Sequence, residues 1–234
     1  MAIAVAQTVI GTSASVSSIA LASWTPAAND LVLLAVETRG VSVTHSSISG
    51  NGLTWTQIGA SVDGSTNIRA SLWRGMAASP TIGQITVTLS GAPAAALAVA
   101  TRFSGVNTTT PVEANTSANN ALSSTPSVSV TTLTANAWAF GAHYDRGSTF
   151  TVGSGESAIS LNNVTGTSGN ILNISTEQQL VVSPGAATLD GTWSAAVSWV
   201  AIAAAIKPAA GGAPGGRGGR SVQGGAVVLT SGGA

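Results

Sequence analysis

Short β-prone runs separated by turn residues recur along the chain, and this spacing constrains the fold more than any other feature. Ile85, Val87 and Leu89 alternate with polar residues, so that they share one face of an extended strand. Turn signals such as Gly50-Asn51-Gly52 lie between the runs and supply the backbone conformations that tight turns need. No long segment carries an apolar stripe at a spacing of 3.6 residues. The pattern predicts an all-β protein.

The expected strands fall into two series. The first covers residues 3–10, 16–24, 30–38, 53–61, 68–76, 84–90 and 95–104. The second covers residues 126–133, 136–144, 149–152, 171–176, 179–183, 187–193 and 196–206.

The two series echo one another. In the first, the apolar run 31–36 is followed by Thr38-Arg39-Gly40, and in the second the run 137–142 is followed by Asp145-Arg146-Gly147. Later, 85–89 and 95–103 in the first series match 187–193 and 196–206 in the second. Such an echo indicates two related halves.

Two architectures fit this echo. One has two tandem small sandwiches, over residues 1–110 and 111–208, and the other has one larger sandwich over 1–208 with pseudo-symmetric halves. We favour the single antiparallel two-sheet β-sandwich, jelly-roll-like, because the polar junction 107–125 is short and the strand count suits two sheets of a jelly roll.

Charge is scarce. The chain of 234 residues has eight acidic and eight basic residues, 7% in total and no net charge, whereas about a quarter of an average soluble protein is charged. A surface of this kind repels little and tends to associate, so much of it is expected to be covered by other subunits. The lack of basic clusters argues against nucleic-acid binding.

Other compositional features exclude further classes. There is no cysteine, which excludes disulfides and thiolate metal sites. The longest apolar run, near 195–206, is too short to span a bilayer as a helix, and the first ten residues lack the basic region of a signal peptide. We therefore expect neither a membrane segment nor a leader.

No motif identifies a reaction. His45 and His143 stand outside HxH and HExxH spacings, and GxSxG, Walker A and βαβ-type GxGxxG motifs are absent. His143-Tyr144-Asp145-Arg146 would suit a hydrolytic site, but a strand that leads into a polar turn is the favoured interpretation. The acidic residues are scattered singly, although distant strands could still bring a glycosidase-type pair together. We expect no catalytic, cofactor or metal site.

Two residues are candidates for a ligand or an interface. Trp24 stands just before Thr25-Pro26 and is expected to be the most exposed tryptophan, whereas the other five lie inside expected strands and suit the core. Arg74 is next to Trp73 on one strand and faces the other side. The arginines are expected to pair with Glu37, Asp63 or Glu113, or to contact neighbouring subunits.

The composition changes after Pro208. Residues 209–234 form a Gly-rich arm that contains Arg217 and Arg220 and ends in a short β-prone run. We expect this run, Val227-Val228-Leu229, to pair with a sheet edge of a neighbour or of its own domain, as in β-augmentation. The alternatives are a tail without a partner and an RGG-type RNA-binding segment, for which two arginines are few.

Several segments resemble a β-sandwich module of tailed-phage virion proteins and bacterial surface proteins. The likeness rests on residues 29–36, 48–55, 70–75 and 103–106 and extends roughly over residues 16–115. It implies a non-enzymatic capsid decoration, head-fibre or tail-fibre protein of a bacteriophage. Such a protein would assemble in the host cytoplasm with itself or with the major capsid protein or another virion protein, and would bind no cofactor. The alternative is a carbohydrate-binding or adhesive module at a cell surface.

Overall fold

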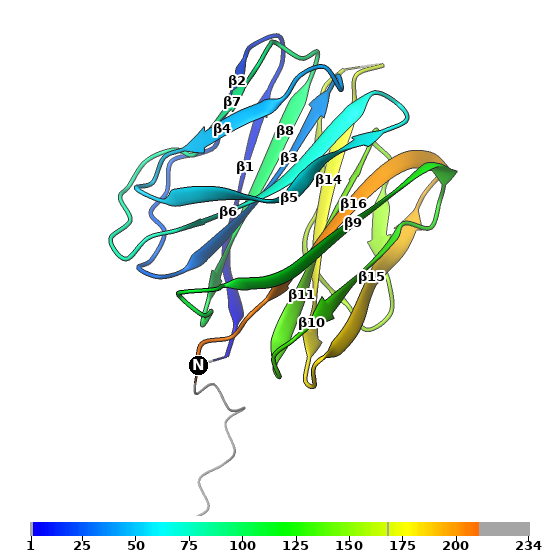
Figure 1. Cartoon of the computed structure of the whole chain (residues 1–234). Helices are drawn as coiled ribbons and strands as arrows, with labels where there is room; N and C mark the ends of the chain where they lie inside the picture. Colours follow the sequence, from blue (N-terminus) through cyan, green and yellow to red (C-terminus); the bar gives the residue numbers. More distant parts are fainter. Residues whose placement is uncertain (1, 168, 211–234) are drawn as a thin grey trace, which may run out of the picture.

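The computed structural model describes residues 2–167 and 169–210, and these form sixteen strands with no helix (Figure 1). None of the described residues, therefore, belongs to a helix that could cross a membrane. All strand pairs are antiparallel. The expected all-β antiparallel sandwich is confirmed.

The strands divide equally between two halves of the chain. The first half contains β1 (Ala4–Ser13), β2 (Ser18–Ala20), β3 (Leu31–Arg39), β4 (His45–Ser49), β5 (Thr54–Gly64), β6 (Ile68–Met76), β7 (Thr86–Leu89) and β8 (Ala96–Ser104). The second contains β9 (Val112–Ser123), β10 (Ser127–Thr132), β11 (Ala137–Asp145), β12 (Phe150–Val152), β13 (Ser157–Thr165), β14 (Leu172–Val181), β15 (Gly185–Trp193) and β16 (Val197–Ile206).

Each half has one five-stranded and one three-stranded sheet with the same strand order. In the first half the orders are β1-β8-β3-β6-β5 and β2-β7-β4. In the second they are β9-β16-β11-β14-β13 and β10-β15-β12, so every strand of the first half corresponds to the strand eight places later. The halves are therefore repeats of one topology.

The register of the central strands is repeated as well. Ala35 and Glu37 of β3 pair with Val99 and Leu97 of β8. The corresponding β11 residues, Ala142 and Tyr144, pair with Ile202 and Val200 of β16. The matching segments that the sequence echo indicated thus occupy equivalent places.

The four sheets stack as layers (Figure 1). The two five-stranded sheets pack face to face around a central core to which both halves contribute, including Leu33, Leu72, Phe140 and Ile202. A three-stranded sheet covers the outer face of each, over a second core in the first half and a third core in the second half. Each half thus has its own pair of sheets, and the two halves share one central core.

The contact between the halves is reciprocal. β1 lies against β13 and β5 lies against β9, and since β9 corresponds to β1 and β13 to β5, the two contacts are equivalent. The pairs β3–β14 and β6–β11 show the same reciprocity. This is the self-complementary contact of a twofold dimer, formed here within one chain.

One end of the molecule gathers the junctions of the chain, and we call it the terminal pole. Here the Ala209 amide donates to the Gly105 carbonyl oxygen at 2.9 Å, and Val106 pairs with Pro208. A Cβ atom on Gly105 would lie 2.1 Å from the Ala2 carbonyl oxygen. The first described residues, the linker between the halves and the last described residues therefore meet at this pole.

Three strands were not expected. β4 and β13 lie outside the expected strand ranges, and the polar junction 107–125 contains β9. All three lie at sheet edges, where polar residues are tolerated on an exposed face.

Candidate functional site

The tryptophan singled out from the sequence is buried. Trp24 is 5% exposed, so the expectation of an exposed Trp24 is wrong. The Trp24 amide donates to the Gly83 carbonyl oxygen, and the Gly83 amide donates to the Trp24 carbonyl oxygen. The Asn51 side-chain amide also donates to the Trp24 carbonyl oxygen, at 2.7 Å. These bonds hold the indole against the core of the first half. The arm residues Arg217, Arg220, Val227, Val228 and Leu229 lie outside the described residues.

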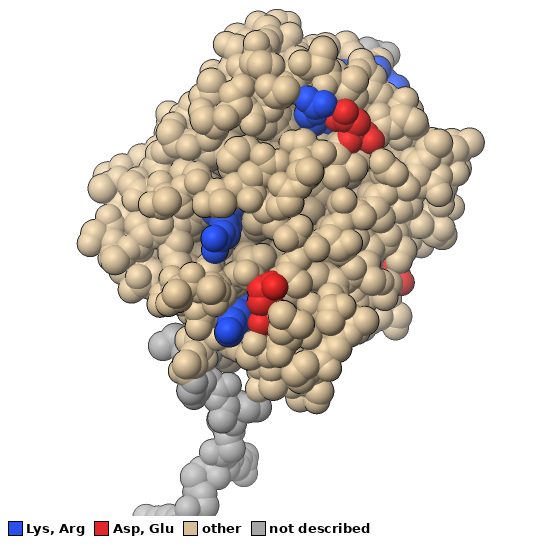
Figure 2. All heavy atoms as spheres, in the orientation of Figure 1, with Lys and Arg blue, Asp and Glu red and all other residues tan. Residues whose placement is uncertain are grey.

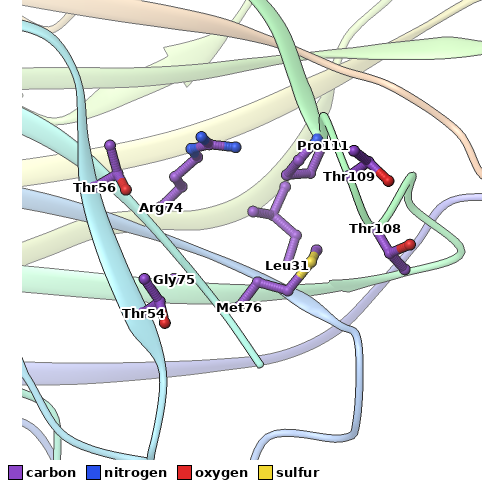
Figure 3. A pocket seen from close by; sticks show the side chains of 9 residues that line it. All are labelled: Leu31, Thr54, Thr56, Arg74, Gly75, Met76, Thr108, Thr109 and Pro111. Carbon is purple, nitrogen blue, oxygen red and sulfur yellow. The ribbon is translucent and has the colours of Figure 1, made fainter. Parts of the chain in front are cut away.

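Arg74, in contrast, lines a surface hollow of about 150 Å³ at the seam between the two halves (Figure 3). Thr56 lies directly opposite Arg74 on the neighbouring strand β5, and Thr54 lies opposite Met76. The linker between the two halves, residues 105–111, supplies the opposite wall of the hollow. The complete lining is Leu31, Thr54, Thr56, Arg74, Gly75, Met76, Thr108, Thr109 and Pro111.

The linker wall is fixed by a turn at Asn107. The Asn107 side-chain oxygen accepts hydrogen bonds from the amides of Thr109 and Thr110, at 3.0 and 2.8 Å. An asparagine that bonds forward in this way forms an Asx-type turn. The Lys207 amide also donates to the Pro111 carbonyl oxygen at 2.9 Å. The hydroxyls of Thr108 and Thr109 are therefore held on a positioned segment.

The other arginines of the described residues are engaged by the protein. Arg69 pairs with Asp63 at 2.7 Å and Arg102 with Asp30 at 3.4 Å. The two remaining ones bond to backbone oxygens, Arg39 to Thr66 and Asn67, and Arg146 to Gly169. The expected pairing of arginines with Asp63 is confirmed, whereas none of the described arginines pairs with Glu37 or Glu113.

Arg74 has neither a hydrogen-bond nor an ion-pair partner within 2–167 and 169–210. No acidic residue lines its hollow. Figure 2 shows how few charged groups share this face of the molecule. The hollow can therefore offer a free guanidinium fork, surrounded by hydroxyls, to an anion.

A second polar group lies deep in the second half. The imidazole Nε2 of His143 is 2.6 Å from a carboxyl oxygen of Glu177, both side chains are fully buried, and Phe150 stacks on the imidazole. Burial lowers the pKa of His143 to about 4 and raises the pKa of Glu177 to about 8. Both groups are therefore neutral at pH 7, and the carboxyl O–H donates to the imidazole nitrogen.

Glu156 completes this group. Its carboxyl oxygens accept from the amides of Asp190 and Gly153, at 2.9 and 3.1 Å, and burial together with the neighbouring Glu177 raises its pKa to about 7. None of these side chains lines the hollow at Arg74. Within the described residues, no His, Cys, Asp or Glu group is arranged to hold a metal ion.

The segment 143–146 does not form a joint site. His143 faces the third core, whereas Tyr144 faces the central core and donates from its hydroxyl to the Ser71 carbonyl oxygen at 3.1 Å. Asp145 is fully buried and accepts from the Ser148 amide at 2.7 Å. None of them lines the hollow, so the arrangement gives no support to a hydrolytic site here.

The seam also holds an isolated carboxyl group. Glu37 is fully buried, and neither of its carboxyl oxygens has a hydrogen-bond partner among the residues that the structure describes. Burial, together with the charge of Asp145, raises its pKa well above the ordinary value. Burial therefore favours the neutral form of the Glu37 carboxyl group. It is the counterpart of Tyr144 in the repeat.

Comparison of the chain with known protein families, with curated proteins and with solved structures gives no match.

Proposed function

We propose that this protein is a non-enzymatic structural subunit of a larger assembly, most specifically a bacteriophage virion protein such as a capsid decoration or fibre protein. It would bind copies of itself, the major capsid protein or another virion protein through its surface, its strand edges and the arm 209–234. The phage assignment comes from the segments that resemble virion modules, and the assembly role is supported by the surface.

The observation that carries the assembly role is the apolar character of the terminal pole. Three large apolar side chains stand more than half exposed around the start of β11, where the Asn136 amide bonds to the Val182 carbonyl oxygen and Trp138 pairs with both Leu180 and Ile206. They are Leu133 at 64%, Val182 at 62% and Leu180 at 55%. Exposed apolar groups gathered at one end of a protein mark a contact surface.

The strand edges are a second support. β9 lies at the edge of its sheet and runs for 12 residues, most of them exposed or half-buried and all uncharged except Glu113. Natural proteins usually protect a long edge with charge or proline, because its free backbone groups can pair with another chain. An edge without this protection suits a subunit that is covered after assembly.

The experiment is self-association and particle attachment of the purified full chain. We expect light scattering to give a mass above that of one chain. We also expect co-sedimentation with particles assembled from the structural proteins of the phage that encodes it. The double variant Leu133→Ser/Leu180→Ser should weaken both.

The matched control is Leu122→Ser/Val164→Ser, which removes two apolar side chains of similar exposure at the opposite end of the second half. It should keep the mass and the attachment of the natural chain. A chain that stays monomeric and ignores particles would refute the assembly role, as would equal losses in the two double variants.

The alternative of a carbohydrate-binding or adhesive module at a cell surface loses one of its two candidate contacts, because Trp24 is buried. Its other candidate, Arg74, lies in an open hollow.

A further inference from the structure

We propose that the Arg74 hollow is a binding site for a carboxylate-bearing sugar residue, such as a uronic acid. This inference is independent of the assembly role, since a virion subunit or an adhesive module could carry such a site. It rests on the unpaired guanidinium, on the hydroxyls around it and on the size of the hollow.

The guanidinium selects for an anion. Arg74 projects into the hollow from β6, and no carboxylate among the described residues competes for its donors (Figure 3). The planar fork of an arginine matches the two oxygens of a carboxylate, which it binds through two parallel hydrogen bonds. In the second half, Gln178 occupies the equivalent position and carries no charge. Only the first half therefore carries a cation at this position of the repeat.

The remaining lining suits a sugar. Thr54, Thr56, Thr108 and Thr109 are the other side chains of the hollow that carry polar atoms, and each has a hydroxyl that can both donate and accept. A sugar ring presents hydroxyls of the same dual character, whereas the carboxylate end of a peptide presents an amide beside its charge. Leu31, Met76 and Pro111 add apolar contacts, which suit the C–H groups of a ring.

The size of the hollow limits the ligand to one small group. Sites for drug-sized ligands measure about 300–1,000 Å³, and this hollow measures about 150 Å³. It can therefore hold the acidic residue of a glycan while neighbouring residues extend into solvent. We expect weak binding of the monosaccharide, in the range of about 1 mM, as for a ligand held by a few contacts.

The test is a titration of the full-length ¹⁵N-labelled chain with glucuronate, followed by NMR. Shifts should be confined to the amides of 54–56, 74–76 and 107–110. Glucose, the uncharged analogue, should produce no comparable shifts. Arg74→Gln, which introduces the residue found in the other half, should weaken binding by about tenfold or more. Lys207→Gln removes a cation from the same pole and should leave binding unchanged.

Four outcomes would overturn the proposal. The first three are the absence of shifts with glucuronate, binding of glucose as tight as that of glucuronate, and equal losses of binding in Arg74→Gln and Lys207→Gln. The fourth is tighter binding of acetate or N-acetylglycine than of glucuronate, which would assign the hollow to a bare carboxylate or to a peptide end.

Discussion

At the scale of single residues, Glu37 is a carboxyl group that the fold does not satisfy. Its oxygens are buried and accept no well-formed hydrogen bond from the residues that the structure describes, although the backbone amide of Asn173 lies near enough to oppose the rise of its pKa. We predict that Glu37→Met, which keeps the volume and removes the polar atoms, raises the free energy of unfolding by about 1–3 kcal/mol. Because the pKa is raised in the folded state, Glu37 costs more stability as the pH rises above about 4.3, and the gain should grow with pH.

Urea denaturation at several pH values measures this gain, and Glu113 provides the control. The Glu113 carboxyl accepts from the amides of Leu133 and Thr134 and from the Thr134 hydroxyl, at 2.7, 3.1 and 2.6 Å. Glu113→Met should therefore destabilise the protein. If the two substitutions shift the midpoint in the same direction, the description of Glu37 as unsatisfied is wrong.

Glu177 predicts a loss of stability as the pH rises from about 4.3 to about 8. Its pKa is raised to about 8 in the folded state, whereas an exposed glutamate titrates near about 4.3. Between these values the folded protein holds a proton that the unfolded chain has released, so the free energy of unfolding falls as the pH rises. Glu177→Gln, whose amide can still donate to His143, should flatten this part of the profile of thermal unfolding against pH.

The acid side of that profile gives the control for Glu177→Gln. The pKa of His45 is lowered to about 4 by burial, and this histidine lies in the other half of the chain. Between about pH 6.5 and about 4, His45 is protonated in the unfolded chain but stays neutral in the folded protein. The free energy of unfolding therefore falls as the pH is lowered through this range. The His45 contribution to this limb should be kept in Glu177→Gln, whereas His143, whose pKa is also lowered to about 4, contacts the substituted residue. An unchanged slope between about pH 6.5 and 8 in that variant would contradict the assignment.

The individual site residues were only partly predictable from the sequence. Arg74 could be singled out because it alternates with Trp73 on a strand, which places it on the other face. Glu37 and Glu177 look in the sequence like the other scattered acidic residues. Their environments are created by strands far apart in the chain, and so is the burial of Trp24 by the segment around Gly83.

At the scale of elements, an asparagine introduces the central strand of each half. Asn29 and Asn136 have φ values of 62° and 58°, and each stands just before the inner strand β3 or β11. We predict that Asn136→Gly is nearly neutral, because glycine adopts this conformation freely, whereas Asn136→Val costs about 1–2 kcal/mol. Chemical denaturation of both variants measures the difference, and equal stabilities would show that the backbone angle is not what selects asparagine.

The elements were predictable where one face is buried and the residues alternate, as in β7, or where both faces are buried, as in β3 and β16. β9 and β13 were not, because edge strands can carry polar residues on both faces and then look like loops. The sequence pattern also indicates which face of a strand is buried, but not which sheet covers it. For that reason it could not predict the stacking of the two halves.

At the scale of the whole molecule, the meeting of chain segments at the terminal pole predicts that the protein tolerates circular permutation. The segments at Ala2 and Ala209 both contact Gly105, so a short Gly-Ser linker should join Ala210 to Ala2. We predict that this permutant, opened between Thr109 and Thr110, folds with the same circular dichroism spectrum and unfolds cooperatively, because the cut leaves every strand intact.

The matched permutant opened between Ala139 and Phe140 cuts the central strand β11 and should not fold. If both permutants unfold cooperatively, or neither does, then the halves are not joined at the pole in the way described.

The reciprocal contact between the halves has a consequence for how the molecule can change. In a homodimer, every substitution appears twice, once in each copy, and both copies must tolerate it. In one fused chain each copy can diverge alone. The positions of His143 and Glu177 in one copy are held by Val36 and Trp73 in the other, and Arg74 has an uncharged counterpart in Gln178. Duplication thus provides two scaffolds of one shape, in which equivalent interior positions can hold apolar residues in one copy and polar residues in the other.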